Sequence, residues 1–573
     1  MNNQDIIRSH LAALYGPQAG AAAFERLALR LAQAPQRQES RGLSQSDSIL
    51  ITYGDQVRVP GEAPLHTLAD FCRRHLKGIV SGIHILPFYP YSSDDGFSVM
   101  DYRAVDPALG TWDDVARLGR DFRLMFDAVV NHASRQGDWF QAFLRDDPRY
   151  RDYFVVVEGI PDLSAVVRPR ALPLLTEVQT AIGPKRVWTT FSDDQIDLNY
   201  ANPDVLLEIL DLLHFYVAHG AEFIRLDAIA FLWKEIGTSC LHLPQTHRAV
   251  QLIRAVLDAV APGVRLITET NVPHRDNISY FGDGHNEAQM VYNFALPPLT
   301  LHALRTGDAR VLTQWASGLI LPSEQTTFFN FLASHDGIGL NPARGILPDG
   351  EIDALVAGVE AHGGLVSYKH NPDGSRSPYE LNINYFDALN DPRADEPLAR
   401  QVDRFMASQA ILLAMVGVPG IYFHSLCGSR SWPEGVAQTG RSRTINRQKL
   451  NLADLEAELA DPGSLRAQIF DRYTRLLRAR AACNAFQPNG GQRVIDSSDM
   501  VFALWRTSPD QGAAVLCLQN VASRAQIATR VAETLRTSTA RDLISDREVS
   551  IGQDGAVELA PYETLWLIGE SVK

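Results

Sequence analysis

Eight short runs of apolar and β-branched residues recur along the chain, and each predicts a buried strand. Several are separated by stretches with helical spacing, which is typical of parallel strands joined by helices. The runs cover residues 48–53, 82–86, 123–130, 222–230, 265–270, 289–294, 328–333 and 420–423. This pattern predicts an α/β fold built on a (β/α)8 or TIM barrel.

The same pattern divides the chain into parts. Residues 1–47 are rich in Ala, Leu, Gln and Arg with helical spacing, and they predict a helical N-terminal extension to a catalytic barrel over residues 48–486. Two gaps, at about 131–200 and 337–395, are too long for one crossover helix, so we expect inserted loop subdomains that shape a substrate site. Short alternating runs then predict a C-terminal β domain over residues 487–573.

The fourth run carries two charged residues inside an apolar sequence. Arg225 and Asp227 lie two residues apart, so both side chains point to the same face of the predicted strand. A guanidinium beside a carboxylate favours the ionised carboxylate, which suits a nucleophile or an electrostatic stabiliser. A structural ion pair near a strand end explains these two residues equally well.

Further polar residues stand where the predicted strands end. They are Asp94, Asp127, His132, Glu269, His335 and Asp336. Active sites of (β/α)8 barrels lie at the carboxyl ends of the strands, so we expect these side chains to meet. Three carboxylates on one rim indicate glycoside chemistry, in which one attacks the anomeric carbon, one exchanges a proton with the leaving group and one steadies positive charge.

Charge and cysteine content limit the partners. The formal net charge of −14 argues against nucleic acid, and an anionic substrate then needs a local cluster of cations. The five cysteines lie far apart without metal-ligand spacing, which favours reduced thiols in a cytoplasmic protein. Neither a signal-peptide pattern nor an 18-residue apolar run is present. We expect no membrane partner, no metal and no cofactor, and the sequence leaves the oligomeric state open.

Four segments resemble, in chain order and spacing, the motif regions of the α-amylase superfamily of retaining glycosidases: 127–132, 225–227, 269 and 335–336. The resemblance implies that Asp227 is the nucleophile, Glu269 the acid/base and Asp336 the stabiliser of the transition state. It also implies that His132, Arg225 and His335 hold the sugar in the donor subsite.

A narrower resemblance, to the sucrose phosphorylase subfamily, rests on motifs at 86–90, 94–97, 168–170, 195–197, 234–240 and 445–447. It implies that Asp94 and Arg447 bind the far hydroxyls of the glucosyl group. It also implies that Arg170 lies on a mobile loop that meets inorganic phosphate. Gln195, in one of these motifs, is a further candidate for substrate binding.

Two departures from this subfamily concern the acceptor side. Sucrose phosphorylases usually carry Tyr-Gln where this chain has Tyr379-Glu380, and they commonly carry Tyr where it has Phe231. Both differences argue against sucrose and leave the glucosyl chemistry unchanged. Three stretches resemble instead the group of phosphorylases that act on glucosylglycerate: 188–199, 267–274 and 331–342.

The last resemblance implies that 2-O-α-glucosylglycerate and phosphate give α-glucose 1-phosphate and glycerate. Glycerate is anionic, and the second insertion offers Lys369, His370 and Arg376 as cations for its carboxylate. The nearest alternative is phosphorolysis of sucrose or sucrose 6′-phosphate, and the next is an α-glucosidase or transglucosylase. A non-catalytic barrel used for binding is disfavoured because all three rim carboxylates are present.

Overall fold

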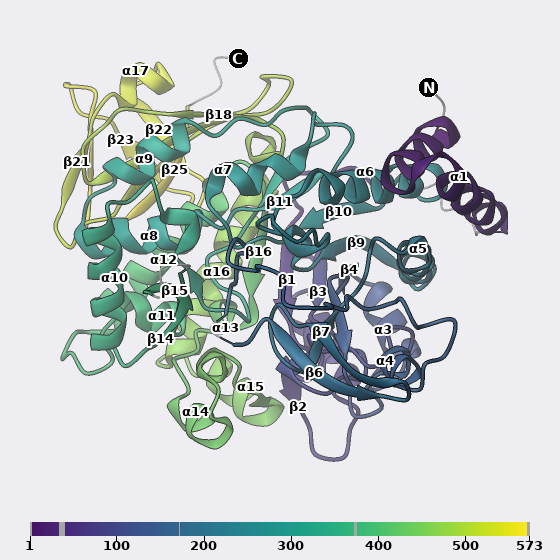
Figure 1. Ribbon diagram of the computed structural model, residues 1–573. Coiled ribbons are helices and arrows are strands. Elements are labelled where there is room, and N and C mark those ends of the chain that lie inside the picture. Colours follow the sequence, from purple (N-terminus) through teal and green to yellow (C-terminus); the bar gives the residue numbers. More distant parts are fainter. Residues whose placement is uncertain (1–2, 34–40, 171, 372–374, 570–573) are drawn as a thin grey trace.

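The computed structural model describes residues 3–33, 41–170, 172–371 and 375–569, whose arrangement Figure 1 shows. Within these residues, eight parallel strands close into a barrel in the order β1-β16-β12-β11-β10-β9-β4-β3. Their bounds are β1 Ile49–Thr52, β3 Gly82–Ile85, β4 Arg123–Ala128, β9 Ala221–Leu226, β10 Arg265–Thr268, β11 Met290–Tyr292, β12 Thr327–Asn330 and β16 Val418–Tyr422. Each predicted run overlaps one of these strands, so the predicted barrel is confirmed.

Helices surround the barrel and cover its strands (Figure 1). The longer ones are α2 Pro64–His75, α3 Trp112–Gly119, α5 Pro203–Ala218, α6 Pro244–Val260, α8 Leu296–Thr306, α9 Arg310–Ser317, α12 Leu398–Ala414 and α16 Leu465–Ala481. Helix α5 begins where its sequence directs: the Asn202 side chain caps the backbone N–H of Asp204, and Pro203 takes the first helical position.

The barrel strands are almost wholly buried, yet two adjacent ones carry opposite charges at their carboxyl ends. All six residues of β4 are buried, including Asp127. In the parallel register of β4 and β9, Asp127 stands directly opposite Arg225. The two buried charges therefore pair across the strands at the end of the barrel where substrate sites form.

The two insertions form small sheets beside this end. In the first, β5 His132–Ser134 pairs with β8 Gln195–Asp197, and β6 Leu175–Thr180 pairs with β7 Gly183–Trp188. In the second, β13 Ile338–Gly339, β15 Arg376–Asn382 and β14 Leu365–His370 form a sheet, and helix α10 Asp349–Ala361 lies between β13 and β14 in the chain. Further elements between this sheet and α16 are α11 Tyr385–Leu389, α13 Phe423–Leu426, α14 Pro433–Thr439, the 3-10 helix η5 Ser442–Asn446 and α15 Leu452–Ala460.

Helix α1 Asn3–Gln33 and the C-terminal strands flank the barrel, on the right and the left of the view in Figure 1. Helix α1 is interrupted at Gly16, whose φ of 81° is non-helical, and it lies beside α5 and α6. The C-terminal part holds an antiparallel sheet, which among the described residues has six strands in the order β18-β19-β20-β25-β22-β23. Its strands are β18 Gly491–Val494, β19 Val501–Thr507, β20 Ala514–Asn520, β22 Thr539–Asp542, β23 Glu548–Ser550 and β25 Thr564–Gly569. The domain boundaries at residues 47 and 486 stay predictions.

Candidate active site

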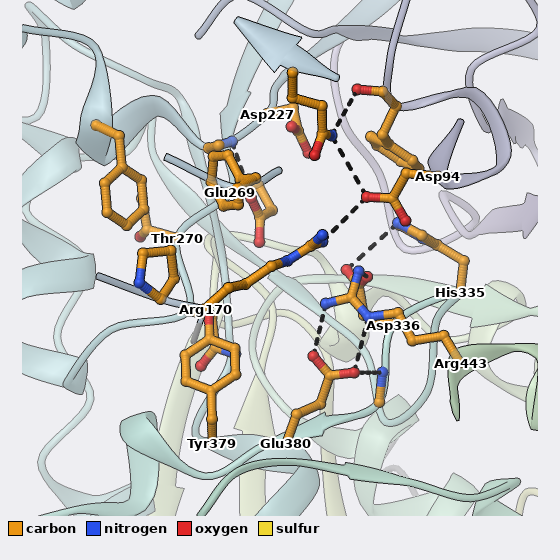
Figure 2. A pocket seen from close by; sticks show the side chains of 18 of the residues that line it. Asp94, Arg170, Asp227, Glu269, Thr270, His335, Asp336, Tyr379, Glu380 and Arg443 are labelled. Carbon is orange, nitrogen blue, oxygen red and sulfur yellow. Dashed lines mark hydrogen bonds and ion pairs between the residues drawn. The ribbon is translucent and has the colours of Figure 1, made fainter. Parts of the chain in front are cut away.

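A pocket opens at the carboxyl ends of the barrel strands, and Figure 2 shows the side chains that converge on it. Eleven of the predicted site residues line it: Asp94, His132, Arg170, Gln195, Asp227, Phe231, Glu269, His335, Asp336, Tyr379 and Glu380. Arg225 lies buried behind Asp227, and Arg447 lines an adjoining outer pocket. The predicted residues thus come together from five barrel strands and both insertions.

Arg225 joins two carboxylates below the pocket floor. Its Nη1 donates to Asp227 Oδ1 at 2.8 Å and to Asp127 Oδ1 at 2.5 Å. Asp127 is held from its other oxygen by His84 Nε2 at 2.7 Å. The charge of Arg225 and the bond from His84 outweigh the effect of burial and lower the pKa of Asp127 to about 2. Arg225 is therefore fixed from behind while it reaches forward to Asp227.

A strained backbone position links Asp227 to Glu269. Ala228 follows directly after Asp227 and takes the left-handed conformation with φ of 51°, which is uncommon for a residue with a side chain. In this conformation its backbone N–H donates to Glu269 Oε2 at 3.0 Å. The turn therefore places the two predicted catalytic carboxyls at neighbouring positions of the pocket wall.

The protonation of this pair follows from burial. Burial is the largest influence on both groups, and it raises the pKa of Asp227 and of Glu269, while Arg225 opposes the shift and neighbouring carboxylates add to it. Arg225 donates directly to Asp227 but lies 3.8 Å from Glu269. Arg225 therefore favours the ionised form of Asp227 more directly than that of Glu269.

Asp336 has the opposite environment. Arg443 Nη1 lies 2.6 Å from Asp336 Oδ1, and His335 Nε2 lies 3.4 Å from Oδ2. Burial favours the neutral acid here too, but Arg443, His335, Arg447 and Arg225 outweigh it and lower the pKa of Asp336. The pocket thus holds one carboxyl whose pKa is lowered beside two whose pKa values are raised.

Asp94 is the centre of a hydrogen-bond network on one side of the pocket. Arg170 Nη2 donates to Asp94 Oδ2 at 3.0 Å, and Gln195 Nε2 lies 3.5 Å from the same oxygen (Figure 2). Gln195 also donates to the Phe97 carbonyl at 3.0 Å and lies 3.1 Å from His132 Nε2. Burial favours the neutral acid, but the charge of Arg170 and of two further arginines outweighs it and lowers the pKa of Asp94.

Arg447 lies on the outer side of this network, where it lines the outer pocket. Its Nη1 donates to Asp95 Oδ2 at 2.5 Å and its Nε to the His335 carbonyl at 2.8 Å. The His335 ring stacks on Phe97 with centroids 4.6 Å apart, and burial lowers the pKa of His335 to about 3. A neutral histidine is thereby held flat against the pocket wall.

Comparisons with known proteins agree with this geometry. Residues 75–336 match the family described as alpha amylase, catalytic domain. The chain is 51% identical over 584 residues to glucosylglycerate phosphorylase of Spirochaeta thermophila, with 99% of each chain covered. It is 52% identical over 562 residues to glucosylglycerate phosphorylase of Allomeiothermus silvanus, with 98% of each covered.

The chain belongs to the glucosylglycerate phosphorylase family. A crystal structure of sucrose 6F-phosphate phosphorylase from Thermoanaerobacter thermosaccharolyticum matches it with a TM-score of 0.74 and 24% identity, over 91% of this chain and 100% of that one. That likeness supports the fold, and the nearly full-length identities establish the family.

The cations of the pocket differ from those expected for the acceptor. Lys369 and Arg376 are not among the described residues that line the catalytic pocket or the outer one, and the side chain of His370 lies outside the described part of the structure. The arginines that line the catalytic pocket are Arg170 and Arg443. Sequence reasoning missed Arg443, and its one signal was its position in the motif region just before 445–447.

Three further findings concern metals, membranes and thiols. Among the described residues, no group of three or more His, Cys, Asp or Glu side chains is arranged to hold a metal ion. In the same part of the chain, no helix has both the length and the apolar character needed to cross a membrane. The five cysteines are free thiols.

Proposed function

We propose that this chain converts 2-O-α-glucosylglycerate and phosphate into α-glucose 1-phosphate and glycerate with retention at the anomeric carbon. The observation that carries the proposal is the similarity of the chain, over nearly its full length, to two glucosylglycerate phosphorylases to which it is 51% and 52% identical. The pocket supports it because three carboxyls, two with raised and one with lowered pKa values, surround one space.

In the first step the glucosyl group moves to the enzyme. Asp227 Oδ attacks the anomeric carbon, the bond from that carbon to the glycerate oxygen breaks, and Glu269 gives its proton to this oxygen. Burial raises the pKa of Glu269 and so favours its acid form, while the hydrogen bond from Arg225 favours the ionised form of Asp227. Glycerate then leaves, and a covalent glucosyl intermediate on Asp227 remains.

In the second step phosphate replaces glycerate. Glu269, now ionised, takes the proton of the attacking phosphate oxygen, which bonds to the anomeric carbon as the bond to Asp227 breaks. Two inversions give net retention. The positive, oxocarbenium-like charge that forms on the sugar in each step is stabilised by the negative charge of Asp336, whose pKa is lowered.

Phosphate needs a cation inside a pocket rich in carboxylates. Arg170 offers one, because it uses a single Nη atom on Asp94 and its side chain is 30% exposed. A guanidinium with free donors can hold phosphate through two parallel hydrogen bonds. We propose that Arg170 binds phosphate, that Asp94 and Arg447 bind the glucosyl hydroxyls, and that Phe231 and Tyr379 lie on the acceptor side.

The experiment that tests the function is product analysis. Purified protein incubated with 2-O-α-glucosylglycerate and inorganic phosphate is expected to release glycerate and α-glucose 1-phosphate in equal amounts, followed by ¹H and ³¹P NMR. Formation of β-glucose 1-phosphate would contradict the double displacement. Free glucose as the main product would contradict phosphorolysis and favour a hydrolase.

We also propose that the protein works in the cytoplasm without nucleic-acid or membrane partners. Its free cysteines are compatible with a reducing compartment, and its net charge of −14 disfavours binding to phosphate backbones.

A further inference from the structure

We infer that Glu380 and Arg443 form a clamp that positions Asp336, so that Glu380 acts on the reaction through Arg443 and not through contact with the acceptor. Glu380 had been expected on the acceptor side because of its place after Tyr379. The inference rests on the proposed role of Asp336, and the experiment below separates the two.

The contacts of Arg443 carry the inference. Its Nε and Nη2 donate to the two oxygens of Glu380 at 2.9 and 2.7 Å, a bidentate pair, and its Nη1 lies 2.6 Å from Asp336 Oδ1 (Figure 2). Each of the three nitrogens of the guanidinium therefore faces a carboxylate. A planar fork held on one edge by two parallel bonds can present its remaining nitrogen in one direction only.

Glu380 is itself fixed and has little surface to offer a ligand. Its side chain is 2% exposed, and its Oε1 accepts a further hydrogen bond from the backbone N–H of Gly337 at 2.9 Å. A Cβ at Gly337 would lie 2.6 Å from Glu380 Cγ and 2.8 Å from Oε1, closer than packed atoms allow. Glycine beside Asp336 is thus required for the carboxylate to come this close.

The clamp joins two distant segments to the catalytic strand end. Glu380 lies on β15 of the second insertion, Arg443 lies in η5, and Asp336 follows β12. Asn446, also in η5, donates to the backbone carbonyl of Asp336 at 3.0 Å, so the same helix holds both the side chain and the backbone of this residue. A displacement of about 1 Å at such a group is enough to cost about 100-fold in rate.

The test uses Glu380→Gln and an acceptor comparison. A positioning role affects every glucosyl transfer, so kcat with glycerate, with phosphate and with water as glucosyl acceptor is expected to fall by the same factor, between about 10- and 100-fold. The KM for glycerate is expected to stay within about twofold. A selective rise in the glycerate KM, with hydrolysis of α-glucose 1-phosphate unchanged, would overturn the clamp and restore Glu380 to the acceptor site.

Removal of the arginine gives a second readout, in the pKa of Asp336. The charged and titratable groups that face Asp336 are Arg443, His335, Arg447, Arg225, Asp227, Glu269, Tyr53, Tyr292, Tyr379 and Tyr422. Because Asp227 must also be ionised and its pKa is raised, the acid limb of the rate reports Asp227, so the pKa of Asp336 is followed directly by NMR of ¹³C-labelled aspartate, assigned with Asp336→Asn. Arg443→Gln removes a charge that lowers the pKa of Asp336 and should raise this pKa, whereas Glu380→Gln leaves Arg443 charged and should not raise it. A pKa of Asp336 that Arg443→Gln leaves unchanged would contradict the clamp.

Coupling and controls complete the design. Glu380→Gln added to Arg443→Gln should cost little more than Arg443→Gln alone, because both act through one contact, and full additivity would contradict the clamp. Glu360→Gln, on the exposed side of α10 in the same insertion, is the matched control and should match the wild type.

If Asp336→Asn keeps its activity, the proposed role of Asp336 fails. If Asp336→Asn is inactive and Glu380→Gln is fully active, only the clamp fails.

Discussion

Asp227 shares Arg225 with Asp127, so the arginine stays in place when the charge on Asp227 changes. Once the proposed glucosyl ester forms on Asp227, the negative charge of Asp127 still balances the buried guanidinium of Arg225. Burial of this guanidinium without any negative partner would be strongly unfavourable. Asp227→Ala is therefore expected to fold, and to lose about 10⁴-fold or more in kcat, because no other group can form the ester. Circular dichroism and steady-state rates check both parts. Residual activity within tenfold of the wild type would exclude Asp227 as the nucleophile.

Glu269, the proposed acid/base, is expected to determine the basic limb of the reaction. Its pKa is raised by burial and by the charge of Asp336, so the acid form persists above the usual range for a glutamate. Release of glycerate needs this proton, and the rate should fall as pH rises through the raised pKa. Glu269→Gln should abolish that limb and slow the reaction by about 10² to 10⁴-fold. With α-glucosyl fluoride, whose leaving group needs no proton, the first step should be nearly normal, and an equal loss with both substrates would contradict the assignment.

Arg170 is expected to make the enzyme prefer phosphate to water as the glucosyl acceptor. Arg170→Ala should raise the KM for phosphate by about 10- to 100-fold because charged hydrogen bonds to phosphate are lost. It should also increase the share of free glucose among the products. Arg168→Ala, two residues earlier and not among the residues that line the pocket, is the matched control and should leave both quantities unchanged. An unchanged phosphate KM in Arg170→Ala would remove this residue from the phosphate site.

At the scale of elements, one buried lysine ties the first insertion to the barrel. Lys234 Nζ lies 2.6 Å from Asp197 Oδ2 on β8, donates to Asn131 Oδ1 at 2.8 Å, and donates to the Phe231 carbonyl. These oxygens lie within two residues of His132, Gln195 and Phe231, which line the pocket. The lysine thus fixes three pocket residues from behind.

Breaking this tie should cost both stability and substrate affinity. Lys234→Met leaves the buried Asp197 without a cation, although Asn131 and Thr190 still donate hydrogen bonds to it. The unbalanced buried charge should lower the free energy of unfolding by about 3–5 kcal/mol and raise the KM for the glucosyl donor. The Lys77–Asp121 pair has the same 2.6 Å separation, but its lysine is 61% exposed, so Lys77→Met should cost no more than about 1 kcal/mol. Denaturant unfolding measures both variants, and equal losses would contradict the argument.

The barrel was predictable because its strands are buried on both faces and read as continuous apolar runs. The carboxylates were predictable because they follow those runs directly. Arg443 was not, since its partners Glu380 and Asp336 lie 63 and 107 positions earlier in the chain. Lys369 and Arg376 were expected at the pocket from their closeness in sequence to Tyr379, but neither is among the described residues that line the catalytic pocket or the outer one.

At the scale of the whole molecule, the net charge of −14 opposes the approach of phosphate and glycerate, both of which are anions. The pocket itself holds five carboxyl groups and two arginines, so only an anion that finds a specific cation should be accepted. A neutral acceptor meets no such barrier. Selection of an anionic acceptor is therefore the property that most clearly distinguishes the proposed activity from phosphorolysis of sucrose.

A side-by-side measurement of synthesis rates from α-glucose 1-phosphate tests this claim most directly. Equal concentrations of D-glycerate, glycerol, fructose and fructose 6-phosphate are compared as acceptors, and phosphate release is followed. The account predicts fast release with D-glycerate, little with glycerol or either fructose compound, and 2-O-α-glucosylglycerate as the product. A faster rate with fructose or fructose 6-phosphate would contradict the glycerate assignment while leaving the retaining phosphorylase in place.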